Sequence, residues 1–171
     1  MKIQQLIDDI LSWTPQAVTP TVDTVKAGDS QRETRHVATC FMVTAQVLRQ
    51  ARDMGVDLII THEPTYFNHT DADRPEHPLV QAKRKLVEES GITIWRYHDH
   101  MHRTFPDGIV QGVLEALGWN GRQEDYLWVL DQPRSARQMA GEIKKHLGAG
   151  AVRVTGALDP RQYHIVPVAA P

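Results

Sequence analysis

The order of apolar and polar positions along the chain predicts alternating helices and strands. Over residues 2–12, apolar side chains recur at three- and four-residue spacing with polar residues between them, which predicts an amphipathic helix. The same spacing predicts four further helices, at residues 44–54, 77–90, 109–117 and 135–147. In the helix over 77–90, we expect the apolar side chains to face inward, at Leu79, Val80, Leu86 and Val87.

Short apolar runs between these helices predict strands. They occupy residues 36–43, 56–61, 92–97, 126–130, 152–154 and 164–168. The runs at 36–43 and 56–61 are apolar enough for buried strands, whereas residues 19–31 are polar and contain a turn signal at Gly28. Strands that alternate with helices favour an α/β fold, with a mixed, largely parallel sheet and helices on both faces. The length of 171 residues fits a single α/β domain over 1–171.

Composition narrows the class of protein further. An apolar share of 41% and a charged share of 23% are typical of globular chains. The net charge of -2 argues against nucleic acid or a membrane surface as a partner. The single cysteine, Cys40, has no partner for an internal disulfide, and no apolar run approaches the length of a membrane span. We therefore expect a cytoplasmic protein.

Histidine is the unusual feature of the composition. Most of the nine histidines lie in two regions, around residues 62–77 and 98–102. Each region contains a short motif directly after a predicted strand, Thr61-His62-Glu63-Pro64 and His98-Asp99-His100-Met101-His102. Ligand sites in open α/β sheets lie beyond the carboxyl ends of strands, so the two motifs are expected to meet at one place. If the strand continues, His98, His100 and His102 share one face.

Imidazole and carboxylate groups at one place predict a site for a divalent transition metal. Such a mixed nitrogen and oxygen set suits zinc, iron, manganese, nickel or cobalt, and the sequence does not choose among them. Taken alone, any one of these histidines is more often a surface or hydrogen-bonding residue than a ligand. Because these histidines are grouped with acidic residues, a role as metal ligands is favoured over the surface role. The histidines that lack acidic neighbours keep the ordinary role, namely His36, His146 and His164.

Other polar and aromatic residues near the motifs receive weaker assignments. Arg96 is the best candidate to meet an anionic substrate if it faces the cleft, and His69 is close enough to His62 to line the same pocket. Trp95 and Tyr97 are interpreted as core or pocket wall. A solvated loop is expected for Asp71, Asp73, Glu76 and His77.

With these two motifs the chain resembles the Nif-three-like family, whose members are often labelled GTP cyclohydrolase I type 2. Family members typically show an apolar strand ending in Thr-His-His-Pro. A later strand ends in His-Thr-Asn-Leu-Asp, followed by a helix and a leucine-glycine pair. The corresponding segments here are residues 56–64, residues 98–102 and Leu117-Gly118, so the resemblance spans nearly all of the chain.

The resemblance implies specific metal ligands. His62 matches the family's first metal-binding histidine, Glu63 stands where a second histidine is usual, and His102 stands where a bridging aspartate is usual. Both departures keep a residue type that binds metals, but they leave the metal's identity and the bridging geometry open. His98 matches the histidine just before the family's ligand, and is a ligand, an orienting residue or a proton carrier.

The resemblance also implies a dinuclear centre, a ring-shaped hexamer and a second half of the chain that supplies a His-x-x-x-Glu motif. No such motif follows His102 in this sequence. The apolar run at residues 165–170 reads as a strand with nothing after it to cover it. We therefore expect the chain to be the N-terminal part of a longer family-type chain, or another copy of the chain to complete the site.

Two functions of different classes follow from these expectations. The leading hypothesis is a metal-dependent hydrolase, in which one or two metal ions activate water against a nucleotide or cyclic amide and His98 or His100 moves the proton. The alternative is a non-catalytic metal-binding or metallochaperone-like protein that assembles as a homo-oligomer. A third, weaker possibility is an interaction module that binds no metal.

Overall fold

The computed structural model describes residues 1–14, 18–71, 74–104, 107–125, 127–156, 158 and 161–167. Tyr126 and Val168, which end predicted strands, lie outside these residues, as does Asp73. The chain forms two compact units, Met1–Thr104 and Phe105–Pro171, within the span of 1–171 that is predicted as one domain. Each unit is described by itself.

The first unit is built on a four-stranded sheet with the order β1-β4-β3-β2. The strands are β1 (Val25–Ala27), β2 (Val37–Cys40), β3 (Leu58–Thr61) and β4 (Thr93–Arg96). The strands β2, β3 and β4 run parallel, whereas β1 pairs with β4 in the antiparallel direction. The prediction of a mixed, largely parallel sheet is confirmed.

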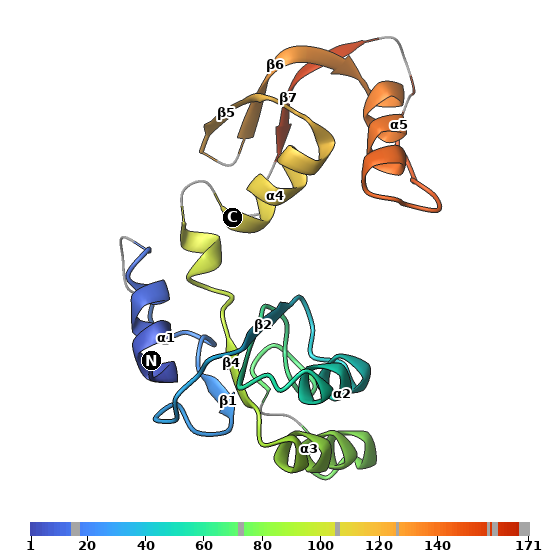
Figure 1. Ribbon diagram of the computed structural model, residues 1–171. Coiled ribbons are helices and arrows are strands. Elements are labelled where there is room, and N and C mark those ends of the chain that lie inside the picture. Colours follow the sequence, from blue (N-terminus) through green and yellow to red (C-terminus); the bar gives the residue numbers. More distant parts are fainter. Residues whose placement is uncertain are drawn as a thin grey trace. The chain divides into compact units, whose positions relative to one another are not determined.

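Helices cover both faces of this sheet (Figure 1). One face packs against α1 (Ile3–Leu11), and the other packs against α2 (Ala45–Asp53) and α3 (Pro78–Ser90). Adjacent strand residues point to opposite faces, so Leu58 joins the cluster around α1 and Ile59 joins the cluster around α2 and α3. This two-sided burial explains why β3 is a continuous apolar run.

The strand β2 differs from the prediction because it lies at the edge of the sheet. The expected buried strand over 36–43 is instead a short strand of alternating exposed and half-buried residues, with Val37 43% exposed. Only one side of β2 pairs with a neighbour, and its apolar content does not reveal this position. The prediction of a buried strand here is wrong.

Helix ends follow the local sequence signals closely. The hydroxyl of Thr44, the first residue of the helix predicted over 44–54, accepts a hydrogen bond from the Val47 N–H and caps α2. Gly91 ends α3 in the left-handed conformation that glycine adopts without a side-chain penalty. Within α3, Val80 and Val87 are buried as expected, but Leu79 is 75% exposed, so its inward assignment is wrong.

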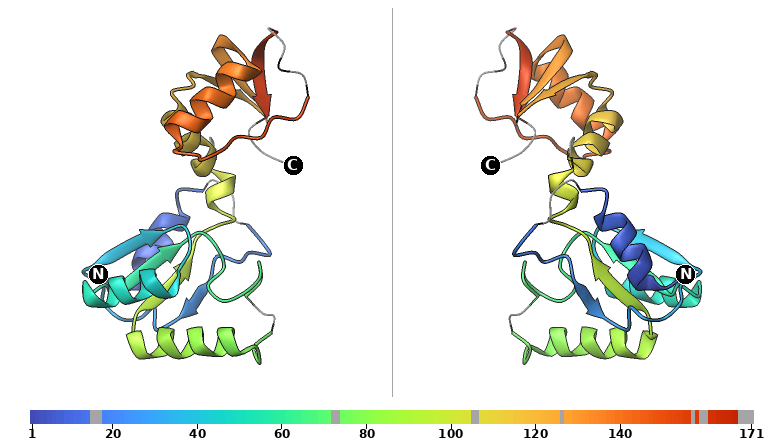
Figure 2. Two further views of the ribbon diagram at one scale, coloured as in Figure 1. Left: turned by 90° about the vertical axis from the view of Figure 1, so that its right-hand side faces the viewer. Right: turned by 90° about the vertical axis from the view of Figure 1, so that its left-hand side faces the viewer.

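The second unit contains a three-stranded antiparallel sheet with the order β5-β6-β7. Its strands are β5 (Gly121–Glu124), β6 (Leu127–Ser135) and β7 (Gln162–Pro167), and its helices are α4 (Gly108–Leu117) and α5 (Ala136–His146). Figure 2 shows α5 beside these strands. The core of the unit gathers side chains from both helices and from the sheet, namely Leu114, Leu117, Trp119, Leu130, Met139 and Ile143.

Several elements of the two units differ from the sequence predictions. Residues 152–154 form no strand, and the strands β1 and β5 were not predicted. Both missed strands are short, and pairing with a neighbouring strand fixes them more than their own residue types do. Among the helices in the described part of the chain, none combines the length and apolar character that crossing a membrane requires.

Candidate metal centre

The strands β3 and β4 are parallel neighbours, and their carboxyl ends deliver the histidine motifs to one edge of the first sheet. His62 follows the last residue of β3, and the Tyr97 N–H donates to the Thr61 carbonyl at 2.9 Å just beyond β4. The chain then turns into a short 3-10 helix, η1 (Met101–Arg103), in which the Arg103 N–H donates to the His100 carbonyl at 3.0 Å. The His102 N–H donates to the His98 carbonyl at 3.2 Å and closes the turn before it. The strand therefore does not continue through residues 98–102, in agreement with the predicted strand end near residue 97.

This turn brings three imidazole rings together. One ligand atom from each of His62, His98 and His102 lies within 4.8 Å of the others. The His62 and His98 rings are stacked with their centroids 4.4 Å apart, and the His102 ring meets both of them edge-on at 5.0 and 4.8 Å. Ring nitrogens that converge from two strand ends form a candidate site for a transition metal.

Two of the three rings are already held through one nitrogen. The His62 Nδ1 lies 3.3 Å from the Tyr97 carbonyl, and the His98 Nδ1 lies 3.0 Å from the Asp99 carboxylate. Both partners are acceptors, so each Nδ1 carries a hydrogen, and in the neutral form of each ring Nε2 is the nitrogen that offers a lone pair to a metal. Histidine ligands of metals are oriented in this way by a carbonyl or carboxylate.

The electrostatics of His62 also favour metal binding. Burial lowers the pKa of His62, the neighbouring His98 and His102 lower it further, and only the Tyr97 carbonyl and the Glu63 charge oppose this. A lowered pKa keeps the imidazole neutral at physiological pH. The neutral form is the one that coordinates a metal.

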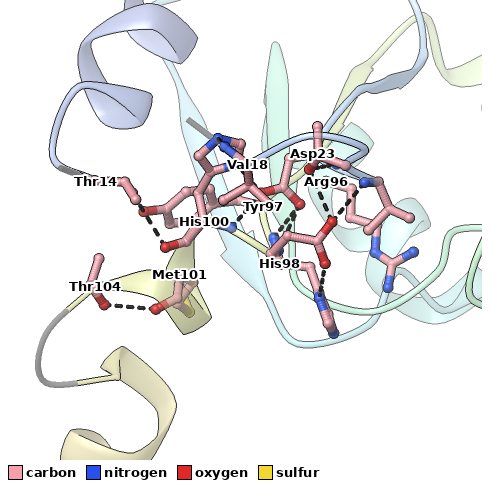
Figure 3. Close-up of polar contacts among 12 residues, drawn as sticks. Thr14, Val18, Asp23, Arg96, Tyr97, His98, His100, Met101 and Thr104 are labelled. Atoms are coloured by element: carbon pink, nitrogen blue, oxygen red, sulfur yellow. Dashed lines mark hydrogen bonds and ion pairs between the residues drawn. The ribbon is translucent and has the colours of Figure 1, made fainter. Parts of the chain in front are cut away.

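A buried carboxylate, Asp23, holds the turn that carries these histidines (Figure 3). One of its oxygens accepts hydrogen bonds from the His98 and Asp99 N–H groups at 2.7 and 3.0 Å. The other oxygen accepts from the His100 N–H at 2.8 Å and lies 2.7 Å from the His100 Nδ1. Asp23 lies in the segment 19–31, which the sequence shows only as polar, so its role was not predicted.

Asp99 is fixed from a second direction. Its Oδ2 accepts hydrogen bonds from the Thr21 hydroxyl and the Val22 N–H at 3.0 and 2.8 Å, while its Oδ1 faces His98. Burial raises the pKa of Asp99, but hydrogen bonds from Val22, His98 and Thr21 outweigh this and lower it to about 2. Asp99 is therefore a carboxylate that orients His98.

His100 lies outside the cluster of three histidines. Its Nδ1 faces Asp23, and its Nε2 accepts the Val18 N–H at 3.4 Å, so both ring nitrogens have protein partners. Its carbonyl also accepts the Thr14 hydroxyl at 3.3 Å. The face that a continued strand would give to His98, His100 and His102 does not form, because the strand ends at Arg96. A proton-transfer role for His98 or His100 stays a prediction.

The remaining site residues fall into three places. Among the described residues, the cluster of ligand atoms within 4.8 Å does not include Glu63. The charge of Glu63 nevertheless raises the pKa of His62. The role of Glu63 as a ligand stays a prediction. Arg96 is fully buried and donates to the carbonyls of His62 and His69, so it supports the histidine loops instead of facing a substrate. The His69 ring contacts the His98 ring edge-on, with centroids 5.1 Å apart.

Side-chain hydrogen bonds hold the backbone of the loop after β3, which the sequence does not suggest. Asp71 is buried and accepts hydrogen bonds from the N–H groups of Thr65, Tyr66 and Phe67, so its assignment to a solvated loop is wrong. His77 caps α3 by accepting the Leu79 N–H at 3.2 Å. Both roles are ordinary uses of turn residues as acceptors, but the sequence alone does not show which N–H groups they meet.

Together the mixed sheet, the helices on both of its faces and the three histidines at its carboxyl edge define an α/β protein with a candidate metal site. The sequence matches the family model described as Duf34/NIF3 (NGG1p interacting factor 3) over residues 1–169, and the chain belongs to this family. The Nif-three-like resemblance is thus confirmed.

Known relatives agree with this membership. The chain is 24% identical over 122 residues to a protein named GTP cyclohydrolase 1 type 2 homolog from Clostridium perfringens (strain 13 / Type A). That match covers 70% of this chain and 46% of the relative, so the chain spans about half the length of the curated relative.

Solved structures show the same fold. The Staphylococcus aureus hypothetical protein SA1388 matches with a TM-score of 0.70 and 18% identity, over 90% of this chain and 66% of the other. Reduced HcgD from Methanocaldococcus jannaschii matches with a TM-score of 0.63 and 18% identity, over 85% of this chain and 60% of the other.

Proposed function

We propose that His62, His98 and His102 bind a divalent transition metal, and that the protein is a metal-dependent hydrolase. The observation that carries the proposal is the convergence of three ligand atoms within 4.8 Å, two of them on rings held at Nδ1 by an acceptor. A set of three imidazoles is a donor set found at catalytic zinc sites, where a further position remains for water. The donors suit zinc, iron, manganese, nickel or cobalt.

The chain's own residues would prepare this site in defined ways. Tyr97 and Asp99 orient the His62 and His98 rings, and Asp23 holds the backbone of the turn. A metal bound there lowers the pKa of a coordinated water toward about 7 and polarises the substrate. Glu63, beside His62, is proposed as a further oxygen ligand.

The relative named GTP cyclohydrolase 1 type 2 homolog suggests nucleotides as the first substrates to test, with cyclic amides second. Metal-loaded full chain should turn over one of these compounds, and chelation should abolish the turnover. Metal binding without any turnover would instead favour the non-catalytic metal-binding or metallochaperone-like function. A homo-oligomer, expected as a hexamer, is part of the proposal and is measured by native mass.

Substitutions at Glu63 test its proposed role separately. Glu63→His should bind metal at least as well as the unmodified chain, because histidine is the family's usual residue here, whereas Glu63→Gln should bind less. If Glu63→Gln keeps full metal content while Glu63→His loses it, Glu63 is not a ligand. Thermal unfolding of both variants controls for loss of the fold.

A further inference from the structure

A cavity of about 700 Å³ lies directly beside the histidine cluster. It is lined by His102 and Asp99 on one side and by the segment around β1 on the other, including Lys26. Its volume lies in the range of sites for small-molecule ligands. A molecule in this cavity would therefore contact the candidate metal centre.

The cavity has two cationic side chains, Lys26 from β1 and Arg103 from η1. In the part of the chain that the structure describes, the Lys26 ammonium makes no hydrogen bond or ion pair. Burial lowers the pKa of Lys26, which shows that the charged ammonium is partly removed from water. A half-buried charge without a partner is costly, so an anion that enters the cavity would offset this cost.

The carboxylates near Lys26 are already engaged elsewhere. Asp71 accepts three backbone N–H groups, and Asp23 holds the turn at residues 98–100. Asp99 uses one oxygen for His98 and the other for Thr21 and Val22. These acids raise the Lys26 pKa from a distance but do not pair with it. The charge of Lys26 thus stays available to a ligand.

We infer that Lys26 and Arg103 form a subsite for a phosphate group of the substrate, next to the histidine cluster; the link to a substrate rests on the proposed function. Two cations match a phosphate, which carries between one and two negative charges near neutral pH, better than they match a single carboxylate. Thr24 lines the same cavity and adds a hydroxyl group that can donate to a phosphate oxygen. The substrate class is then a phosphorylated small molecule.

The test is a calorimetric titration of the full chain with inorganic phosphate, after chelation so that no metal contributes. Lys26→Met and Arg103→Met should each weaken binding by about tenfold or more, since each removes a charge-assisted contact. Lys83→Met is the matched control, because burial also lowers the Lys83 pKa but Lys83 does not line the cavity. Lys26→Arg should retain binding.

The outcomes separate this inference from the proposed function. The subsite is rejected if the chelated chain does not bind phosphate, or if the Lys26 and Arg103 variants bind it like the control. Acetate binding as tight as phosphate binding, at equal ionic strength, would reject phosphate as the ligand class. If purified protein holds no metal but phosphate binding still depends on both cations, the subsite stands and the proposed function fails.

Discussion

His98 and His100 lie two residues apart on the same turn, yet their rings have opposite surroundings. The His100 ring is enclosed between Asp23 and the Val18 N–H, which use both of its nitrogens. The His98 ring is held at Nδ1 by Asp99 and stacks on His62, within the cluster of three histidines. The comparison shows that hydrogen-bond partners, more than residue type, separate a structural histidine from a candidate ligand.

The largest effect should come from Asp23, the residue that fixes both histidines. Asp23→Ala leaves the N–H groups of residues 98–100 and the His100 ring without their acceptor, and should lower the free energy of unfolding by about 3 kcal/mol or more. Urea unfolding of the full chain measures this. Asp23→Asn keeps one acceptor oxygen and should lose less. A loss below about 1 kcal/mol for the alanine variant would contradict the role assigned to Asp23.

The two histidines themselves should separate stability from metal binding. His100→Ala removes a buried ring with two partners and should lower the free energy of unfolding by about 2 kcal/mol in metal-free protein. His98→Ala should cost about 1 kcal/mol or less, because its partner Asp99 keeps two other donors. Urea unfolding of the two variants side by side gives the difference. Equal losses would remove the distinction between the rings.

The smallest effect is the pH dependence that Asp99 contributes. Its folded pKa of about 2 lies below the ordinary value of 3.8, so its contribution to stability is complete above pH 4 and is lost as the pH falls toward 2. The difference in unfolding free energy between the unmodified chain and Asp99→Asn should therefore shrink over this window. Urea unfolding at a series of pH values measures it in metal-free protein. A constant difference from pH 5 to pH 2 would contradict the hydrogen bonds assigned to Asp99.

The parts of the fold that follow from sequence are those in which a segment's own residues decide its structure. The strand β3 is an apolar run because it is buried on both faces. Thr44 begins α2 through its side-chain hydroxyl, and Gly91 ends α3 through its left-handed backbone conformation. The strand β1 is three residues long and forms by pairing with β4, which its sequence does not indicate. The apolar residues of β2 likewise predict a buried strand, because the sequence does not show that β2 lies at the edge of the sheet.

The candidate site shows the same division. His62 and His98 could be placed together because parallel strands end at the same edge of a sheet. The grouping of His102 with them, and the exclusion of His100, depend on a 3-10 turn that Asp23 stabilises from 75 residues away. A contact so distant in sequence leaves no local pattern. Arg96 was misassigned for the same reason, since its partners are backbone carbonyls of other loops.

The most direct test of the account is the metal content of the purified 171-residue chain and its histidine variants, measured by elemental analysis. His62→Ala, His98→Ala and His102→Ala should each lose most of the bound metal, because each removes one of three converging ligand atoms. The controls His36→Ala and His146→Ala should retain it, and thermal unfolding checks that every variant is folded. Equal metal content in all five variants, or no metal in the unmodified chain after loading with zinc, iron, manganese, nickel or cobalt, would contradict the metal centre.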